Sequence, residues 1–308
     1  MTTAFVLFCA LILDAIFGEP KWLWSRVPHP AVLMGRLINW ADTRFNTGGH
    51  RKAKGIVLLI ALVILGGALG WLIALSPALN VIAAAILIAH KSLVQHVKAV
   101  ASGLETSVQD GRDAVAMIVG RDTKDMDAPA VARAAIESAA ENFSDGVIAP
   151  AFWFLIGGLP GLMIYKMVNT ADSMIGYLTP KHADFGWASA RFDDLLNLIP
   201  ARLTMVMLLP LGGHSVITLR AVAQDASKHR SPNAGWPEAA LSRSLSIALS
   251  GPRAYHGEMQ PYDWVNATAR KEAQIHDIHA ACHRLWLAWI MLVLTCLILS
   301  AWSVFLLA

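Results

Sequence analysis

Long, uninterrupted apolar runs dominate the hydrophobic pattern of this chain. Residues 285–308 contain no charged side chain, and residues 55–75 form a second run of the same kind. Each run is long enough to cross about 30 Å of hydrocarbon as a helix that rises about 1.5 Å per residue. Ser76 and Pro77 interrupt the pattern before a shorter apolar run to Ala89, so a helical hairpin is predicted there.

Three further apolar runs contain a charge or a helix breaker. Residues 3–17 include Asp14, and residues 146–165 include the sequence GGLPG. The third run, at about 195–219, includes Arg202. Charged side chains inside a bilayer are costly and tend to be functional. The first run lacks the basic leader and cleavage site of a secretory signal, so we interpret it as a retained anchor.

The composition supports the same class of protein. Of 308 residues, 56% are hydrophobic and 15% are charged, which is far more apolar than a soluble domain of this length needs for its core. Period-two strand patterns are nearly absent, and no cluster of basic and aromatic residues indicates nucleic-acid binding. The predicted fold class is therefore all-α, a polytopic integral membrane helical bundle with cytoplasmic helical loops.

Basic residues are concentrated in three segments, at about 18–54, 91–145 and 220–284. Lys and Arg close to membrane spans are retained on the cytoplasmic side. An even number of spans between these segments places all three in the cytoplasm. We therefore predict one membrane domain over residues 1–308 with these cytoplasmic excursions, located in the inner cell membrane as a multi-pass protein whose active site faces the cytoplasm.

An acidic stripe precedes one of the interrupted apolar runs. Asp127 is placed as the N-cap of a helix through VARAAIESAAEN, on which Arg133, Glu137 and Glu141 recur every four residues. Asp145 extends the stripe if the helix persists. A solvated helix face is one interpretation. Because the helix leads directly into an apolar run, where unpaired carboxylates are costly, a bound hard cation such as magnesium is the other.

The glycines and proline of GGLPG are expected to break the helix that follows. Beyond the break, Lys166, Asn169, Asp172 and Ser173 fall on nearly one helical face. If the chain folds back at GGLPG, this polar set shares a cavity with the acidic stripe. We therefore predict a broken or re-entrant segment near residues 146–178. The alternative is a plain span whose lysine extends to the lipid headgroups.

A second polar concentration lies in FGWASARFDDLLNLIPARL, at the start of another apolar run. This density favours a polar functional cavity over salt bridges at a helix boundary. The residues concerned are Arg191, Asp193, Asp194, Asn197 and Arg202. His29 and His229 each lie in a proline-rich loop where helical packing is not expected, so either is a candidate general acid or base.

Several of these segments together resemble one known family. They are DAIFGEP, PHPAVLMG, IVGRDT, RAAIESAAENFSDGVIAP, YKMVNTADSMIGY, FGWASARFDDLLNLIPARL and HRSPNAGWPEAAL. In combination they closely resemble the CobD/CbiB cobalamin-biosynthesis family, the membrane adenosylcobinamide-phosphate synthases. The resemblance covers most of the chain.

The resemblance implies an ATP-dependent acid–amine ligase that attaches aminopropanol, or its phosphate, to a propionate carboxylate of adenosylcobyric acid. It implies ATP and Mg²⁺ as cofactors, the corrinoid as substrate rather than cofactor, and contact with the lipid bilayer and with other cobalamin-pathway enzymes. No GxxxxGK[ST] motif occurs, so ATP use rests on the resemblance alone.

Under this hypothesis the polar residues divide by expected role. The catalytic candidates are Glu137, Glu141, Asp145, Lys166, Asp172, His29 and His229, and the first three are also the candidate magnesium ligands. The candidates for binding substrate and phosphate are Arg121, Arg133, Asn142, Asn169, Ser173, Arg191, Asp193, Asp194, Asn197 and Arg202.

Two other functions are compatible with parts of the pattern. Charges near broken helices are also typical of a small-molecule transporter, but the chain shows no internal symmetry. A membrane regulatory protein of the AmpE type would not need the full polar inventory. The enzyme hypothesis predicts that Glu141, Lys166, Asp172 and Arg191 converge on one cytoplasmic cavity.

Overall fold

The computed structural model of the protein describes residues 2–213, 218–255 and 258–307. Helices dominate this part of the chain, and its strands are segments of two or three residues. Among the described residues, five helices are long and apolar enough to cross a membrane. They are Arg51–Ala74, Pro77–Thr106, Ala128–Ile175, Trp187–Gly212 and Ile275–Ser303. The predicted all-α polytopic membrane fold is confirmed.

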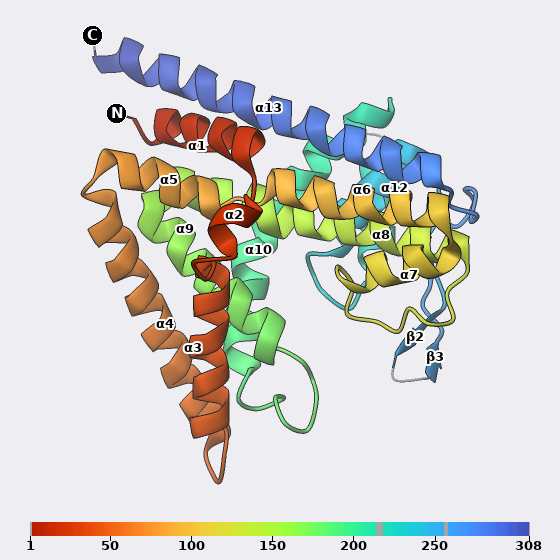
Figure 1. The fold of residues 1–308 in the computed structure, drawn as a ribbon, viewed down its shortest axis with the longest axis horizontal. Coiled ribbons are helices and arrows are strands. Elements are labelled where there is room, and N and C mark those ends of the chain that lie inside the picture. The colour runs from red at the N-terminus through yellow and green to blue at the C-terminus, as the bar shows by residue number, and fades with distance from the viewer. Residues whose placement is uncertain (1, 214–217, 256–257, 308) are drawn as a thin grey trace. The chain divides into compact units, whose positions relative to one another are not determined.

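The chain divides into two compact units (coloured by residue number in Figure 1). The first unit comprises Met1–Ala89, Asp145–Leu198 and Val293–Ala308, and the second comprises His90–Ser144 and Ile199–Leu292. The two units are defined by which residues pack together, and they do not show which segments lie inside the bilayer. The prediction of one membrane domain with three cytoplasmic excursions therefore stays a prediction.

The first unit is built around two long apolar helices, α4 and α9, which pack along each other (Figure 1). Its helices are α1 (Thr3–Phe17), α2 (Lys21–Trp24), α3 (Pro30–Phe45), α4 (Arg51–Ala74), α5 (Pro77–Leu87), the π-helix η1 (Ser144–Ile148), α9 (Ala149–Ile175) and the first part of α10 (Trp187–Leu208). The Ser76 hydroxyl accepts a hydrogen bond from the Leu79 amide at 3.5 Å, which separates α4 from α5 as predicted.

Glycines on α4 allow it to approach α9 closely. A Cβ atom added to Gly70 would lie 2.6 Å from Cα of Pro160, and one added to Gly66 would lie 3.2 Å from the backbone of Ile164. Gly66 and Gly70 form a GxxxG pair, the spacing that brings two helix backbones together in membranes. The tight contact fixes the second half of α9 against α4.

The chain reverses direction within α9. Gly158 has φ 60° and ψ −156°, a conformation that breaks the helix. The Tyr165 hydroxyl donates to the carbonyl oxygen of Asp145 at 3.0 Å. In a straight helix these two positions would be about 30 Å apart. The predicted fold-back at GGLPG is confirmed by the conformation of Gly158 and by this contact.

The second unit places α6 (His90–Thr106) against α7 (Val108–Ala116) and α8 (Ala128–Phe143) (Figure 1). The Asp127 carboxylate accepts from the Ala130 amide at 2.8 Å, so the predicted N-cap of α8 is confirmed. The other helices are the later part of α10, η2 (Leu209–Gly212), α11 (Leu219–Ala226), α12 (Gly235–Leu245) and α13 (Ile275–Leu307), whose residues from Val293 belong to the first unit.

Two short antiparallel pairs complete the second unit. β1 (Leu249–Ser250) pairs with β4 (Trp264–Val265), and β2 (Arg253–Tyr255) pairs with β3 (Glu258–Gln260). These strands follow α12 directly in the chain. Residues 214–217, at the end of the third interrupted apolar run, lie outside the described residues.

Candidate active site

A buried cluster of one carboxylate and two guanidinium groups lies in the second unit, and we call it the glutamate cluster (Arg121, Glu137, Ser250 and Arg253). Oε2 of Glu137 lies 2.6 Å from Nη2 of Arg121 and 3.3 Å from Nη1 of Arg253. The Ser250 amide donates to Oε1 at 2.8 Å. The three charged side chains are only 7–12% exposed, so removing one partner would leave a buried charge uncompensated.

The glutamate cluster has an excess of positive charge. Arg133 is a third cation within electrostatic reach of Glu137. Its guanidinium lies 4.8 Å above the ring of Trp264, and Nη1 donates to the carbonyl of Lys271 at 3.3 Å. Cations that are already oriented and partly desolvated bind phosphate oxygens well. The arrangement suits an anionic ligand better than a metal ion.

Beside this cluster, Glu238 and His229 form a second pair. Nε2 of His229 lies 3.9 Å from Oε2 of Glu238, and the buried Oε1 has no hydrogen-bond partner among the described residues. Burial, and then the negative charge of Glu137, raise the pKa of Glu238 to about 8. Burial, and then the charge of Arg253, lower the pKa of His229. Near neutral pH the pair therefore holds one proton on the carboxyl beside a neutral imidazole.

The tautomer of His229 follows from its other ring nitrogen. Nδ1 accepts a hydrogen bond from the amide of Ser231 at 3.0 Å, so in the neutral ring the proton is on Nε2, facing Glu238. At 3.9 Å the two groups face each other beyond hydrogen-bonding distance. The acid–base role of His229 stays a prediction.

The first unit contains a hydrogen-bonded network across the fold-back, which we call the aspartate network (Tyr165, Asn169, Asp193 and Asn197). Asn197 donates to Oδ2 of Asp193 at 2.9 Å, and Asn169 donates to Oδ1 at 3.3 Å. The Tyr165 hydroxyl lies 3.1 Å from Oδ1 of Asn197. Asp193 and Asn197 are buried. The network joins the second arm of α9 to α10 and gives both carboxylate oxygens of Asp193 a donor.

Lys166 lies next to this network on α9. Its ammonium group is within electrostatic reach of the carboxylates of Asp145, Asp193 and Glu19. It forms no ion pair or hydrogen bond within the described part of the chain. The fold-back therefore places the predicted Lys166 and Asp145 in one neighbourhood, as expected. A partly buried cation without a direct partner is available to an anionic ligand.

His29 has a structural role that the sequence did not indicate. It is the N-cap of α3, where Nδ1 accepts from the amide of Ala31 at 3.2 Å, and its ring packs edge-on against Trp24. The expectation that no helical role is available to this loop residue is therefore corrected. Burial lowers the pKa of His29. The acid–base role of His29 stays a prediction.

Other predicted residues make local contacts. The Arg191 side chain is 69% exposed and lies 3.6 Å from Asp194, an i,i+3 pair on the surface of α10. Arg202 donates to Asn233 at 2.9 Å and stacks over Trp236 in the second unit. For Arg191 the geometry matches the boundary salt bridge that was the alternative interpretation.

Three further predicted side chains bond within their own helices or lie beside a turn. The side-chain amide of Asn142 donates a hydrogen bond to the backbone carbonyl of Ser138 at 2.9 Å. The Ser173 hydroxyl donates to the backbone carbonyl of Asn169, also at 2.9 Å. Asp172 is half-buried at the end of α9, where its carbonyl accepts from the Gly176 amide. Glu141 is exposed on α8.

The predicted site residues fall into both compact units. Those of the second unit are Arg121, Arg133, Glu137, Glu141, Asn142, Arg202 and His229. Those of the first unit are His29, Asp145, Lys166, Asn169, Asp172, Ser173, Arg191, Asp193, Asp194 and Asn197. That both sets form one pocket stays a prediction.

The proposed set of magnesium ligands does not match the geometry. Among the described residues, no group of three or more His, Cys, Asp or Glu side chains is arranged to hold a metal ion. Glu137 is held by two arginines. Magnesium as a ligand of these three carboxylates is therefore not supported.

Several site residues were missed from the sequence. Arg253 and Ser250 lie in the short strands β2 and β1, and their contacts with Glu137 on α8 have no local sequence signal. Tyr165 begins the quoted segment YKMVNTADSMIGY, but its hydroxyl was assigned no role from the sequence. Glu238 lies in the quoted segment HRSPNAGWPEAAL, and Glu19 lies in DAIFGEP. Each is an acidic residue beside a proline in a family segment, and this feature could have identified both as site candidates.

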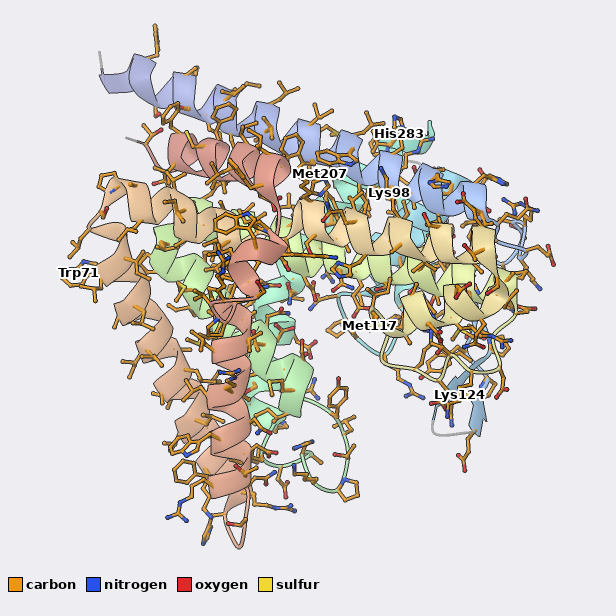
Figure 2. All side chains as sticks on the ribbon, viewed as in Figure 1. Trp71, Lys98, Met117, Lys124, Met207 and His283 are labelled. Atoms are coloured by element: carbon orange, nitrogen blue, oxygen red, sulfur yellow. The ribbon has the colours of Figure 1, made fainter. Side chains whose placement is uncertain are left out.

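Together, the fold and these clusters define a polytopic helical membrane protein with buried, charge-rich sites (all side chains in Figure 2). A sequence profile described as CobD/Cbib protein matches residues 7–285. The chain belongs to the CobD/CbiB family.

Curated relatives agree with this assignment. The chain is 47% identical over 295 residues to "Cobalamin biosynthesis protein CobD" of Rhizobium meliloti (strain 1021), covering 90% of each chain. It is 46% identical over 298 residues to the protein of the same name from Sinorhizobium sp, covering 91% and 92%. The protein of that name from Rhodobacter capsulatus is 44% identical over 280 residues, covering 87% and 88%. No solved structure matches the chain.

Proposed function

We propose that this protein is a membrane-bound enzyme of cobalamin biosynthesis that attaches aminopropanol, or its phosphate, to the propionate carboxylate of adenosylcobyric acid in an ATP-dependent step. The observation that carries the proposal is the near-full-length similarity to cobalamin biosynthesis proteins at 44–47% identity. The chemical detail rests on the sequence resemblance. The two buried clusters supply groups that this chemistry needs.

Forming the amide replaces one carboxylate oxygen by the amine nitrogen. In the simplest route the carboxylate takes the γ-phosphoryl group of ATP and ADP leaves, giving an acyl phosphate. The amine then attacks the acyl carbon and loses a proton, and phosphate leaves with that oxygen. The reaction therefore needs cations for phosphate and carboxylate oxygens and a base for the amine. The proposal assigns no resident metal ion to the protein.

The glutamate cluster fits the first need. Glu137 holds Arg121 and Arg253 in fixed positions, and Arg133 lies close enough to add a third positive charge. Preorganised cations stabilise developing negative charge without reorganising during the reaction. Lys166 provides a similar cation in the first unit.

The pair of His229 and Glu238 fits the need for a base. The imidazole is neutral because its pKa is lowered, but Nε2 carries its proton and Nδ1 accepts the Ser231 amide, so the carboxylate form of Glu238 is the candidate base. The neighbouring carboxyl, with a pKa of about 8, is able to release a proton or take one up near physiological pH. Catalytic groups are most effective when their pKa lies near the working pH.

The experiment is an assay of purified protein in membranes with adenosylcobyric acid, aminopropanol phosphate and ATP, scored by mass spectrometry for the amide product. Lys166→Met is expected to lower the rate at least roughly 100-fold, the usual effect of removing one charge-stabilising group. Because Lys166 has no ion-pair partner in the described part of the chain, the variant should fold normally.

Lys98→Met is the matched control, since Lys98 is exposed on α6 (labelled in Figure 2). Its rate is expected to equal that of the unmodified protein. No product from the unmodified protein, with every substrate confirmed active, would refute the proposed reaction. Equal rates for the two lysine variants would remove Lys166 from the site.

A further inference from the structure

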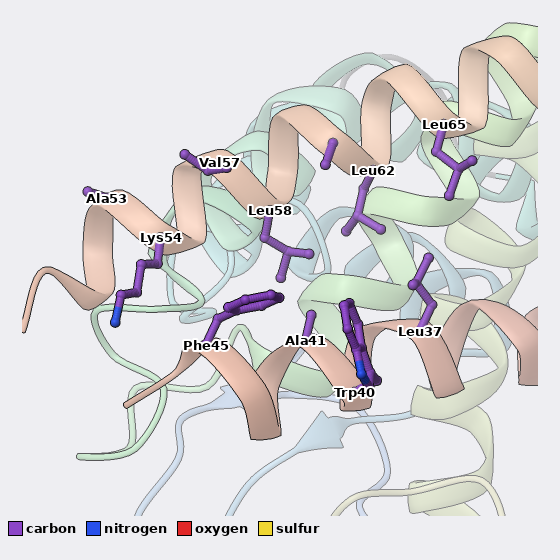
Figure 3. A pocket seen from close by; sticks show the side chains of 11 residues that line it. Leu37, Trp40, Ala41, Phe45, Ala53, Lys54, Val57, Leu58, Leu62 and Leu65 are labelled. Atoms are coloured by element: carbon purple, nitrogen blue, oxygen red, sulfur yellow. The ribbon is translucent and has the colours of Figure 1, made fainter. Parts of the chain in front are cut away.

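An apolar groove runs between α3 and α4 in the first unit (Figure 3). It has a volume of about 420 Å³. Its lining is apolar apart from one residue, Lys54, at one end. Leu37, Trp40 and Phe45 line it from α3, while Leu58 and Leu62 line it from α4 (Figure 3). None of these residues belongs to the clusters described above.

The dimensions of the groove match one lipid chain. On α4 the lining extends from Ala53 to Leu65, which is about 18 Å along the helix axis. One leaflet of the hydrocarbon core is about 15 Å deep. α4 is one of the helices able to cross a membrane, so the groove lies along the direction in which an acyl chain extends.

The polar end of the groove is positive. Lys54 lines it, and its ammonium donates only to the neutral carbonyl oxygen of Thr47, at 2.7 Å. Arg44 follows Leu37 by seven residues, Trp40 by four and Ala41 by three. At these helical spacings it lies on the same face of α3 as those three groove residues. Arg44 is exposed and forms no ion pair in the described part of the chain. Within the described residues, no acidic side chain pairs with Lys54 or Arg44.

From this combination we infer that the groove between α3 and α4 is a binding site for an anionic phospholipid. One acyl chain occupies the apolar groove, and the headgroup phosphate lies between Lys54 and Arg44. Basic residues at a membrane surface attract anionic headgroups, whereas the apolar lining alone would not distinguish among lipids with the same chains. The charged end therefore makes the site selective.

The test uses delipidated, detergent-purified protein titrated with phosphatidylglycerol or with phosphatidylcholine of identical chains, with bound lipid counted by native mass spectrometry. Phosphatidylglycerol is expected to bind more tightly. Lys54→Gln and Arg44→Gln are each expected to weaken its binding roughly fivefold and to weaken that of phosphatidylcholine much less, because the choline cation offsets the charge of its phosphate. Ala61→Trp, which fills the groove from an exposed position on α4, should weaken binding of both lipids.

Lys52→Gln is the matched control, because it removes the same charge two residues from Lys54. Its ammonium lies 3.8 Å above the ring of Trp187 and does not line the groove. This variant is expected to keep the preference for phosphatidylglycerol. The inference is overturned if both lipids bind equally, or if Lys52→Gln and Lys54→Gln have the same effect. It is also overturned if Ala61→Trp dissociates a dimer instead, since a second copy of the chain would then be the occupant.

Discussion

The reversal of α9 at Gly158 can be tested by adding a single methyl group. A φ of 60° with a ψ of −156° lies in a region that is essentially restricted to glycine. A Cβ atom at this position would meet only Cδ of Pro160, at 3.6 Å, which is an ordinary contact. The effect of Gly158→Ala therefore arises from the backbone and not from a clash. We expect it to cost about 1–3 kcal/mol of unfolding free energy, roughly a 5- to 150-fold change in the unfolding equilibrium.

The neighbouring glycine provides the control. Gly157 has no positive φ, and an added Cβ atom would meet nothing within 4 Å. Gly157→Ala is therefore expected to be neutral, or to stabilise the helix by up to about 1 kcal/mol. The assay is equilibrium unfolding of both variants in detergent micelles by titration with a denaturing detergent. If Gly158→Ala proves as stable as Gly157→Ala, the chain does not reverse at this residue and the placement of Lys166 beside Asp145 loses its basis.

Two further outcomes follow from the packing and from the titrating groups. Gly70→Val is expected to destabilise the protein by about 1–3 kcal/mol, because its Cβ atom would lie 2.6 Å from the backbone of Pro160. Gly67→Val, whose Cβ atom meets only the end of a side chain at 3.5 Å, should cost much less. Thermal unfolding compares the two, and equal loss would contradict the close approach of the helices. Glu238 has a pKa of about 8 in the folded protein, above the value of about 4.3 for an unfolded chain. Its contribution to stability is therefore fully present below about pH 4 and is lost as the pH rises toward 8. Glu238→Gln should flatten this decline, by up to roughly 1.4 kcal/mol per pH unit, and parallel stability–pH curves for the two proteins would show that the carboxyl is already ionised.

Much of the candidate site could be named from the sequence, because charges in apolar surroundings are conspicuous. Asn169, Asp193 and Asn197 were selected for this reason and are joined in one network. Arg121 and Glu137 were also selected, for different roles, and the structure joins them as an ion pair. The sequence could identify such residues, but a stripe at helical spacing does not show which partner each charge has.

The interaction partners of these charged residues are identified by contacts between distant parts of the chain. Arg253 is 116 residues from Glu137 along the chain, and no local pattern relates the two positions. The cap formed by His29 depends on where α3 begins. These features follow from the packing of whole elements. They could not be read from the residue types alone.

The sequence by itself determined the class of this protein, because apolar runs long enough for a bilayer and glycine–proline interruptions act locally. It determined the N-cap at Asp127 and the break at GGLPG for the same reason. Only the tertiary structure decided that Glu137 is neutralised by two arginines. It also decided that Lys166 lies near carboxylates and pairs directly with none of those in the described ranges. The free energy of a buried charge depends on its neighbours in space, and folding selects those neighbours from distant parts of the chain.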